Sequence, residues 1–473
     1  MADSIQHTLR LDVGNLMAER VGSSRGITDE AIARWQLRAL AALKAVQSAR
    51  GKGWLGWMDL PAQPESLIQS IEDTARTIRE KYDAFVLLGI GGSALGPACL
   101  HAAMKPLHYN ELPKEKRGGP RMYFEDNIDP ERMAALRDVV DFDKTCFNVI
   151  TKSGGTAETM SQYLYVRGAL AGNPDWRKQV VATTSDSKGL LADIAKKEGL
   201  PTFIVPDNVG GRYSELSPVG LLAAAVDGVN IRELLKGAAD MDAWCASTEL
   251  WDNPALLEAT LMAIAYTEMG RNIQVMMPYA DSLRLVSDWF VQLWAESLGK
   301  RINREGRDVF VGQTPVKALG VTDQHSQLQL YSEGPFDKVI TMLKVESFKH
   351  ETVIPSAPDN YPDDIRFLGG LTHSRLIEAE RFGTEYALTQ AGRMNQTIIL
   401  PEVNAYTMGQ LLYFLEITTA YMGELLDIDA FNQPGVEASK IATYAKLGHT
   451  APKYDAAKAE LAAAPARNLR YII

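Results

Sequence analysis

The 473-residue sequence has few cysteines, no long hydrophobic run and no apolar leader. Its three cysteines, Cys99, Cys146 and Cys245, are odd in number and widely spaced, which disfavours both a disulfide framework and a zinc site. The longest nearly unbroken apolar stretch, Pro218–Val226, is too short to span a bilayer. Residues 1–10 are polar and charged where an export signal needs an apolar core. We therefore expect a protein of the reducing cytoplasm with no membrane association.

Positive charge is also scarce. The sequence holds 49 Lys and Arg against 59 Asp and Glu, which gives a net charge of −10. This balance argues against nucleic acid and against an anionic membrane as partners, because both select basic patches. An anionic substrate would have to meet positive charge gathered locally. Lys and Arg residues beside glycine-rich loops are therefore the first candidates for a binding site.

The remaining composition is that of a globular protein. Hydrophobic residues make up 46 % of the chain and charged residues 23 %, which suits a large buried core. Between residues 82 and 205, short apolar runs alternate with amphipathic stretches, the pattern of a parallel sheet covered on both faces. We expect a doubly wound unit with strands at Ala84–Gly89, Arg121–Phe124, Cys146–Ile150, Gln179–Ala182 and Thr202–Val205.

A second alternation follows. Strands are expected at Ile273–Met277, Val339–Val345 and Thr397–Leu400, and long helices at Ser282–Leu298 and Tyr406–Leu426. The first 80 residues are mainly helical in pattern, and the alanine-rich tail 454–473 is expected to form a helix packed on the body. We predict an α/β protein divided into a helical segment 1–75, a smaller α/β unit 76–230, a larger α/β unit 231–450 and a helical tail 451–473.

The first candidate binding loop is Gly89–Ser93, which lies between a strand and a helix. Glycines there let backbone N–H groups approach an anion, helped by the helix N-terminus. With Ala94 the loop also fits the weak dinucleotide pattern, and Glu125 and Asp126 after the second strand favour that alternative slightly. A tight turn without any ligand is a further alternative. A P-loop is excluded, because no Gly-Lys-Ser/Thr follows.

The second loop, 151–159, carries four hydroxyls and two glycines in nine residues after the third strand. Hydroxyl and backbone donors together suit the three oxygens of a terminal phosphate. The alternative is an ordinary helix cap through Ser153 or Thr156, which would need only one hydroxyl. The third loop, 208–214, places Arg212 after paired glycines, where its guanidinium could hold an oxyanion or form only a surface salt bridge.

Several segments, taken in order along the chain, resemble motifs of the glucose-6-phosphate isomerase family. Besides the first two loops, these are Asp207–Ser214, Glu296–Lys300, Asp323–His325 and Phe431–Lys440. The resemblance spans roughly residues 89 to 440. It implies two doubly wound α/β/α sugar-isomerase-type subdomains with parallel-rich sheets. It also implies an aldose–ketose isomerase for a hexose 6-phosphate that needs no metal and no cofactor.

The resemblance also assigns roles. Glu296 would be the general base that moves a proton between C2 and C1 through a cis-enediol, and Arg212 would stabilise the enediolate. His325 would assist ring opening in the neighbouring subunit of a homodimer, and Lys440 would lie near the ring oxygen. The substrate and its phosphate would be held by Gly92, Ser93, Thr151, Ser153, Thr156, Thr159, Gly211 and Gln433.

Simpler alternatives stay open at this point. Glu296 could be a surface residue at a helix end, and Lys440 could form an ordinary ion pair with Glu437, three residues away on the same helix face. The whole chain could be a non-catalytic sugar-phosphate-binding regulator, a nicotinamide-dependent dehydrogenase, or an isomerase for mannose 6-phosphate.

Two departures from the family pattern affect the expected site. Asp323 stands before Gln324-His325 where the family has glycine, so its carboxylate could change the orientation of His325. Gly154-Gly155 removes a possible hydroxyl donor and is expected to loosen the phosphate loop.

Overall fold

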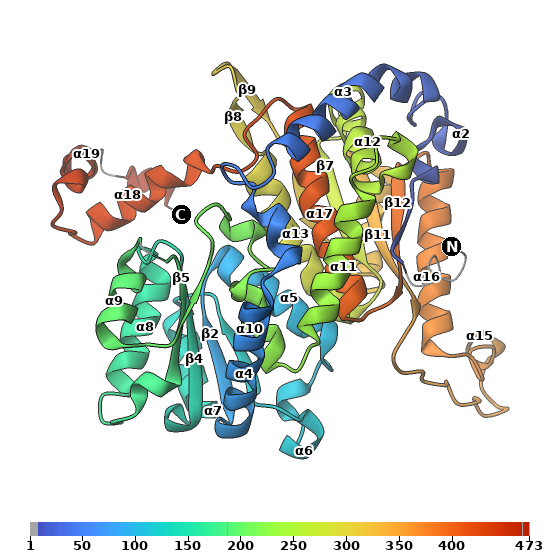
Figure 1. Ribbon diagram of the computed structural model, residues 1–473. Helices are drawn as coiled ribbons and strands as arrows, with labels where there is room; N and C mark the ends of the chain where they lie inside the picture. Colours follow the sequence, from blue (N-terminus) through green and yellow to red (C-terminus); the bar gives the residue numbers. More distant parts are fainter. Residues whose placement is uncertain (1–7, 187, 466, 473) are drawn as a thin grey trace.

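The computed structural model describes residues 8–186, 188–465 and 467–472, and it contains two five-stranded sheets that lie side by side (Figure 1). The first sheet is entirely parallel, with strand order β3-β2-β4-β5-β6. Its strands are β2 (Ala84–Leu88), β3 (Arg121–Glu125), β4 (Thr145–Ile150), β5 (Val180–Thr184) and β6 (Thr202–Ile204). All five strands predicted for this unit are therefore confirmed, with ends shifted by one or two residues.

The second sheet has the order β1-β12-β11-β7-β10. Its strands are β1 (Arg10–Asp12), β7 (Ile273–Pro278), β10 (Thr314–Lys317), β11 (Lys338–Ser347) and β12 (Asn395–Glu402). Four of them are parallel, and β1 joins the edge antiparallel to β12, with Arg10 opposite Ile399. The N-terminal segment is mainly helical, as predicted, but its strand β1, which the sequence did not indicate, belongs to the second sheet. A two-stranded hairpin, β8 (Lys300–Ile302) with β9 (Asp308–Val311), projects from the body (Figure 1).

Helices cover both sheets. The first unit and the preceding segment hold α2 (Ala18–Val21), α3 (Asp29–Ser48), α4 (Glu65–Lys81), α5 (Leu95–Met104), α6 (Lys114–Arg117), α7 (Pro130–Val139), α8 (Ala157–Ala169), α9 (Leu190–Glu198) and α10 (Pro218–Val226). The second unit holds α11 (Ile231–Trp244), α12 (Pro254–Met269), α13 (Arg284–Leu298), α14 (Leu328–Glu333), α15 (Asp363–Arg366), α16 (His373–Gln390) and α17 (Ala405–Leu425). The predicted helices over 282–298 and 406–426 correspond to α13 and α17.

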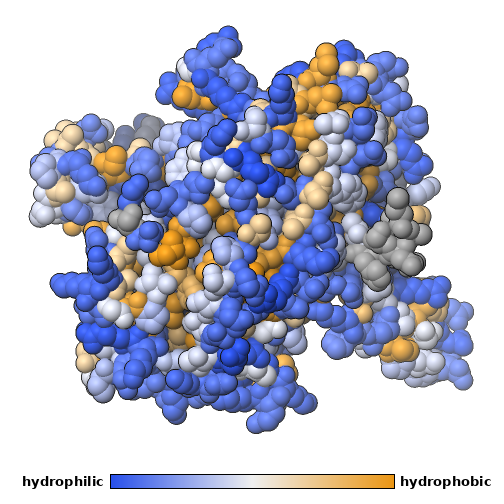
Figure 2. All heavy atoms as spheres, viewed as in Figure 1, coloured by the Kyte–Doolittle hydropathy of each residue, from blue (hydrophilic) through white to orange (hydrophobic). Residues whose placement is uncertain are grey.

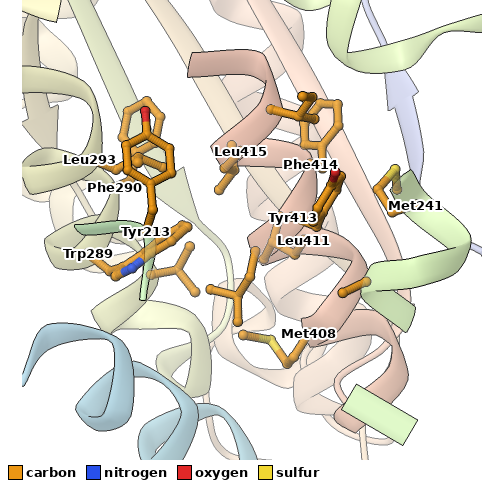
Figure 3. Packing of buried hydrophobic residues seen from close by; sticks show 14 of the residues in the cluster. Tyr213, Met241, Trp289, Phe290, Leu293, Met408, Leu411, Tyr413, Phe414 and Leu415 are labelled. Carbon is orange, nitrogen blue, oxygen red and sulfur yellow. The ribbon is translucent and has the colours of Figure 1, made fainter. Parts of the chain in front are cut away.

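Helix α17 lies at the centre of the main core. It is apolar around its whole circumference and almost entirely buried, and Asn404 and Thr407 form a capping box at its start. Figure 3 shows its side chains facing those of α13 and Tyr213. Tyr213 stacks on Trp57 at a centroid distance of 5.0 Å and contacts Phe431 at 5.4 Å. These contacts fix the residue that follows Arg212.

The C-terminal segment extends away from the two sheets (Figure 1). It contains α18 (Glu437–Lys446) and α19 (Asp455–Ala463). The predicted tail helix is present as α19, but its main contacts are with α18 and the turn Pro452–Tyr454 rather than with a sheet. The parallel-rich α/β fold is confirmed, whereas the boundaries at residues 75, 230 and 450 stay predictions.

Within the described ranges, no helix combines the length and the apolar character needed to cross a membrane. The face seen in Figure 2 is hydrophilic along most of its lower outline, and hydrophobic residues gather towards its middle. The prediction that residues 1–10 carry no export signal falls mostly outside the described residues.

Candidate functional site

The three candidate loops follow β2, β4 and β6, so they lie at one edge of the first parallel sheet, where ligands of such folds bind. The turn Gly91–Ser93 contacts the turn Gly211–Tyr213. A Cβ added to Gly92 would lie 2.1 Å from the Gly211 carbonyl oxygen, so no side chain fits there. The first and third loops are thus joined by direct backbone contact.

The hydroxyl-rich loop presents several donors to this edge. Thr151 and Thr156 lie with their Oγ1 atoms 3.1 Å apart, and Ser153 is exposed with its Oγ accepting from the Gly155 N–H at 3.2 Å. Thr156 is the N-cap residue of α8, but its side chain makes no capping hydrogen bond. Thr159 is buried, and its Oγ1 has no hydrogen-bond partner among the described residues. The capping alternative therefore accounts for little of the hydroxyl content of this loop.

Gly154 fixes this loop rather than loosening it. Its φ is +63°, a conformation that favours glycine, and an added Cβ would lie 2.2 Å from the Leu191 nitrogen. The Leu190 N–H also donates to the Ser153 carbonyl at 3.3 Å. The expectation of a loosened loop is thus wrong at Gly154, because the start of α9 packs directly on it.

Arg212 is 4 % exposed and is held from several sides. Its Nε donates to Ser297 Oγ at 2.7 Å, its Nη2 donates to the Ala430 carbonyl at 2.7 Å, and its Nη1 donates to Gln433 Oε1 at 3.1 Å. The same Nη1 lies 3.5 Å from Glu296 Oε1. Such a guanidinium is aligned before any ligand arrives, which is what electrostatic stabilisation of an oxyanion requires.

Glu296 lies in the last turn of α13, and its side chain keeps 26 % exposure. Its second oxygen, Oε2, accepts from Gln292 Nε2 at 3.0 Å. The Gln292 amide nitrogen would lie 2.9 Å from a Cβ on Gly91, so Gln292 joins the base candidate to the first glycine loop. Sequence reasoning missed Gln292, although its position four residues before Glu296 puts both on one helix face.

Lys300 was also missed as part of the site. It is buried in β8, and its Nζ donates to the Glu296 carbonyl at 2.7 Å and to the Asn432 carbonyl at 2.9 Å. Burial, followed by repulsion from Arg212, lowers the pKa of Lys300 to about 8. Lys300 therefore ties the end of α13 to the segment that carries Gln433.

The structure does not bring His325 and Lys440 to this cluster. His325 is exposed at the end of the turn Thr322–His325, and no described residue hydrogen-bonds to its ring. Lys440 is exposed and pairs with Glu437 at 2.8 Å. Helix α18 nevertheless reaches the phosphate loop, because the Tyr444 hydroxyl donates to the Gly155 carbonyl.

The Asp323 carboxylate accepts hydrogen bonds within its own turn. Its Oδ2 accepts from the Leu319 N–H at 2.7 Å and its Oδ1 from Ser326 Oγ at 2.5 Å. Burial favours a higher pKa for Asp323, but these hydrogen bonds outweigh it and the pKa is lowered. Both oxygens of this carboxylate, which replaces the glycine of the family pattern, are therefore used in hydrogen bonds of the turn.

Glu125 and Asp126, which slightly favoured a dinucleotide site, both form ion pairs with Arg132. Arg132 lies 2.8 Å from Glu125 and 2.8 Å from Asp126. Burial raises the pKa of Glu125 despite this partner. A carboxylate held in this way is a poor acceptor for ribose hydroxyls.

Glycine-rich and hydroxyl-rich loops at the carboxyl end of a parallel sheet, together with a carboxylate and a fixed guanidinium, are typical of α/β enzymes that act on small anionic substrates. A family model described as phosphoglucose isomerase matches residues 66–360. A glucose-6-phosphate isomerase of Carboxydothermus hydrogenoformans is 54 % identical over 447 residues, covering 93 % of this chain and 95 % of that protein. One from Thermus thermophilus is 39 % identical over 398 residues, covering 83 % of this chain and 90 % of that protein. The chain belongs to the phosphoglucose isomerase family.

Solved structures agree on the fold. A Thermus thermophilus protein described as hypothetical superposes with a TM-score of 0.82 at 36 % identity, covering 93 % of this chain and all of that one. A glucose-6-phosphate isomerase from Chlamydia trachomatis superposes with a TM-score of 0.79 at 21 % identity, covering 93 % of this chain and 90 % of that one, which supports the fold alone.

The predicted family and the enzyme class, an aldose–ketose isomerase, are confirmed. A non-catalytic regulator is not favoured.

Proposed function

We propose that this chain interconverts glucose 6-phosphate and fructose 6-phosphate through a cis-enediol, without metal or cofactor. The observation that carries the proposal is the approach of Arg212 to Glu296, 3.5 Å apart, beside the hydroxyl-rich loop. A carboxylate is needed to take a proton from carbon, and a fixed cation is needed for the charge that this leaves on oxygen.

In the forward direction, Glu296 removes the C2 proton of the open-chain aldose while the C1 carbonyl gains a proton and becomes a hydroxyl. The resulting cis-enediol returns to a carbonyl at C2 when the C2 hydroxyl loses its proton. Glu296 gives its proton to C1. One carboxylate serves both carbons because they are adjacent. Arg212 stabilises the enediolate oxygens, and its fixed hydrogen bonds keep it in place during the reaction.

The phosphate is assigned to the first two loops. Backbone and hydroxyl donors from Gly92, Ser93, Thr151, Ser153, Thr156 and Thr159 would surround it, with Gly211 and Gln433 at its edge. The shared edge of the sheet and the contact between the Gly92 and Gly211 turns support this assignment. Lys152 is not assigned to the phosphate, because its Nζ already donates to the Asp207 and Val209 carbonyls.

Ring opening is assigned to His325 of a neighbouring subunit, which moves a proton from the C1 hydroxyl to the ring oxygen. The exposure of His325 and its separation from the Glu296 cluster support a homodimer in which two chains complete each site. Lys440 is assigned to the ring oxygen, which it would reach when its exposed pair with Glu437 opens. We also propose a cytoplasmic enzyme of glycolysis and gluconeogenesis that has neither nucleic-acid nor membrane partners.

The test is a coupled assay. Purified protein receives fructose 6-phosphate, and glucose-6-phosphate dehydrogenase with NADP reports the product. We expect sustained NADPH formation that a metal chelator does not reduce, and slower turnover when mannose 6-phosphate replaces the substrate. Thermal stabilisation by fructose 6-phosphate without turnover would instead indicate a sensor, and the absence of both would remove the ligand assignment.

A further inference from the structure

A second cavity lies between the two units, away from the site described above. Its volume is about 570 Å³, within the roughly 300–1,000 Å³ usual for small-molecule pockets. The first unit contributes the end of α5 and the α6 region, and the second unit contributes the ends of β7 and β11. The carboxyl ends of parallel strands are where such sheets bind ligands, and His325, after β10, is the one residue assigned to the hexose phosphate site that lies in a turn directly following a strand of this parallel set.

The charge of this cavity is opposite to that of the protein. The ionisable lining residues are Lys105, Lys116, Arg117, Lys349 and His350, against the single carboxylate Asp281. The whole chain carries −10, so this is a local reversal of sign.

These cations form no ion pair with any carboxylate of the described residues. In the described part of the chain, none of the three lysines forms an ion pair, and Arg117 donates only to the Leu112 and Gly119 carbonyls at 2.8 and 2.9 Å. Burial, followed by repulsion from Lys105, lowers the pKa of Lys349. The carboxylates that favour the charged lysines are already engaged: Asp227, which acts on Lys105, holds His101 at 2.8 Å, and Glu402, which acts on Lys349, accepts from Asn404 at 2.6 Å. Like charges held together in this way would be stabilised by an anion.

The rest of the lining is apolar or carries an unused polar group. Met104, Leu107, Phe348 and Ile377 provide carbon surface. Tyr109 is 2 % exposed, and its hydroxyl has no hydrogen-bond partner in the described ranges. The Lys105 ammonium lies 5.4 Å from the centre of the Tyr109 ring. Apolar walls beside a group of cations suit a molecule with one anionic end and one apolar end.

We propose that this cavity binds a small organic phosphate with an apolar or aromatic body, at a site distinct from the hexose phosphate site. Helices α5 and α13 pack together and connect the two places. Helix α5 begins after the Gly91–Ser93 turn and ends at the cavity, whereas α13 begins next to the cavity and carries Glu296 in its last turn. Ten residues of α5 span about 15 Å, so the two ligands would not touch.

The test uses 2-naphthyl phosphate as the probe, titrated calorimetrically into the full-length protein saturated with fructose 6-phosphate. We expect one equivalent to bind per chain, and 2-naphthol to bind at least about tenfold more weakly because it lacks the dianion. Lys105→Met with Lys349→Met should weaken probe binding by about tenfold or more. A pair of exposed lysines, Lys178→Met with Lys196→Met, should leave it unchanged.

A second variant guards against misfolding. Leu107 is 67 % exposed, so Leu107→Glu should preserve the fold while its carboxylate repels the probe. Displacement of the probe by fructose 6-phosphate would place it in the hexose site and overturn the proposal. Equal affinity in wild type and in both cavity variants, or equal affinity for 2-naphthol, would also overturn it.

Discussion

Gly92 and Gly211 are in backbone contact: a Cβ on Gly92 would lie 2.1 Å from the Gly211 carbonyl oxygen and 2.6 Å from the Arg212 nitrogen. The contact joins a loop assigned to the phosphate to the loop that carries the enediolate cation. The distance between these two parts of the site is therefore set by the absence of one methyl group.

Gly92→Ala should abolish most activity and destabilise the fold by about 1–3 kcal/mol, because the backbone must shift to admit the methyl group. Turnover and urea unfolding measure the two effects. The matched control is Gly168→Ala on α8, where an added Cβ meets nothing within 4 Å. It should keep full activity and gain about 0.5–1 kcal/mol. Normal turnover in Gly92→Ala would contradict the described contact.

Ser153→Ala with Thr156→Ala should raise the KM for fructose 6-phosphate by about tenfold or more and change kcat far less, since these hydroxyls would bind the phosphate equally in ground and transition states. Steady-state kinetics separate the two constants. Ser161→Ala is the control, because its Oγ donates only to the Glu158 carbonyl on the same helix. An unchanged KM in the double variant would remove this loop from the phosphate site.

The first sheet was predictable because its strands are short, largely apolar runs that end in Gly, Ser, Thr, Asp or Asn, and its three central strands, β2, β4 and β5, are fully buried. β1 was not, because three residues gain strand structure only by pairing with β12, nearly 390 residues later. The pairing of Arg212 with Glu296 came from family motifs, since nothing local in either segment indicates the other. Gly154 was misjudged because its contact with Leu191 is visible only in three dimensions.

Glu215 should be a source of instability at neutral pH. It is 2 % exposed, neither carboxylate oxygen has a partner in the described ranges, and burial together with Glu416 raises its pKa well above 4.5. Because the pKa of Glu215 is higher in the folded than in the unfolded protein, the unfolded form loses this proton at a lower pH. The free energy of unfolding therefore falls as the pH rises above about 4.5. Glu215→Met should therefore add about 1–3 kcal/mol at pH 8 and less at pH 5.

Urea unfolding at both pH values measures this difference. Glu460→Met, at an exposed position on α19, serves as the control and should not change the pH dependence. A wild-type pH dependence in Glu215→Met would show that this carboxyl is not the titrating group.

His325 and Glu296 should complement each other across a dimer. Glu296→Gln and His325→Ala should each be nearly inactive, because every site then lacks one group. Random subunit exchange between them should restore about one quarter of wild-type activity, since half the dimers are hybrids with one intact site. Mixing without exchange is the control. No recovery in verified hybrids would place both residues in the same chain's site.

The most direct test of the central claim follows the proton itself. Glucose 6-phosphate carrying deuterium at C2 is added to the enzyme, and NMR records the deuterium at C2, at C1 of the product and in water. Wild type should remove it from C2 and return part of it to C1. Glu296→Gln should bind the sugar with similar affinity yet remove deuterium about 10²–10⁴ times more slowly. Removal at the wild-type rate in that variant would contradict the assignment of Glu296 as the base.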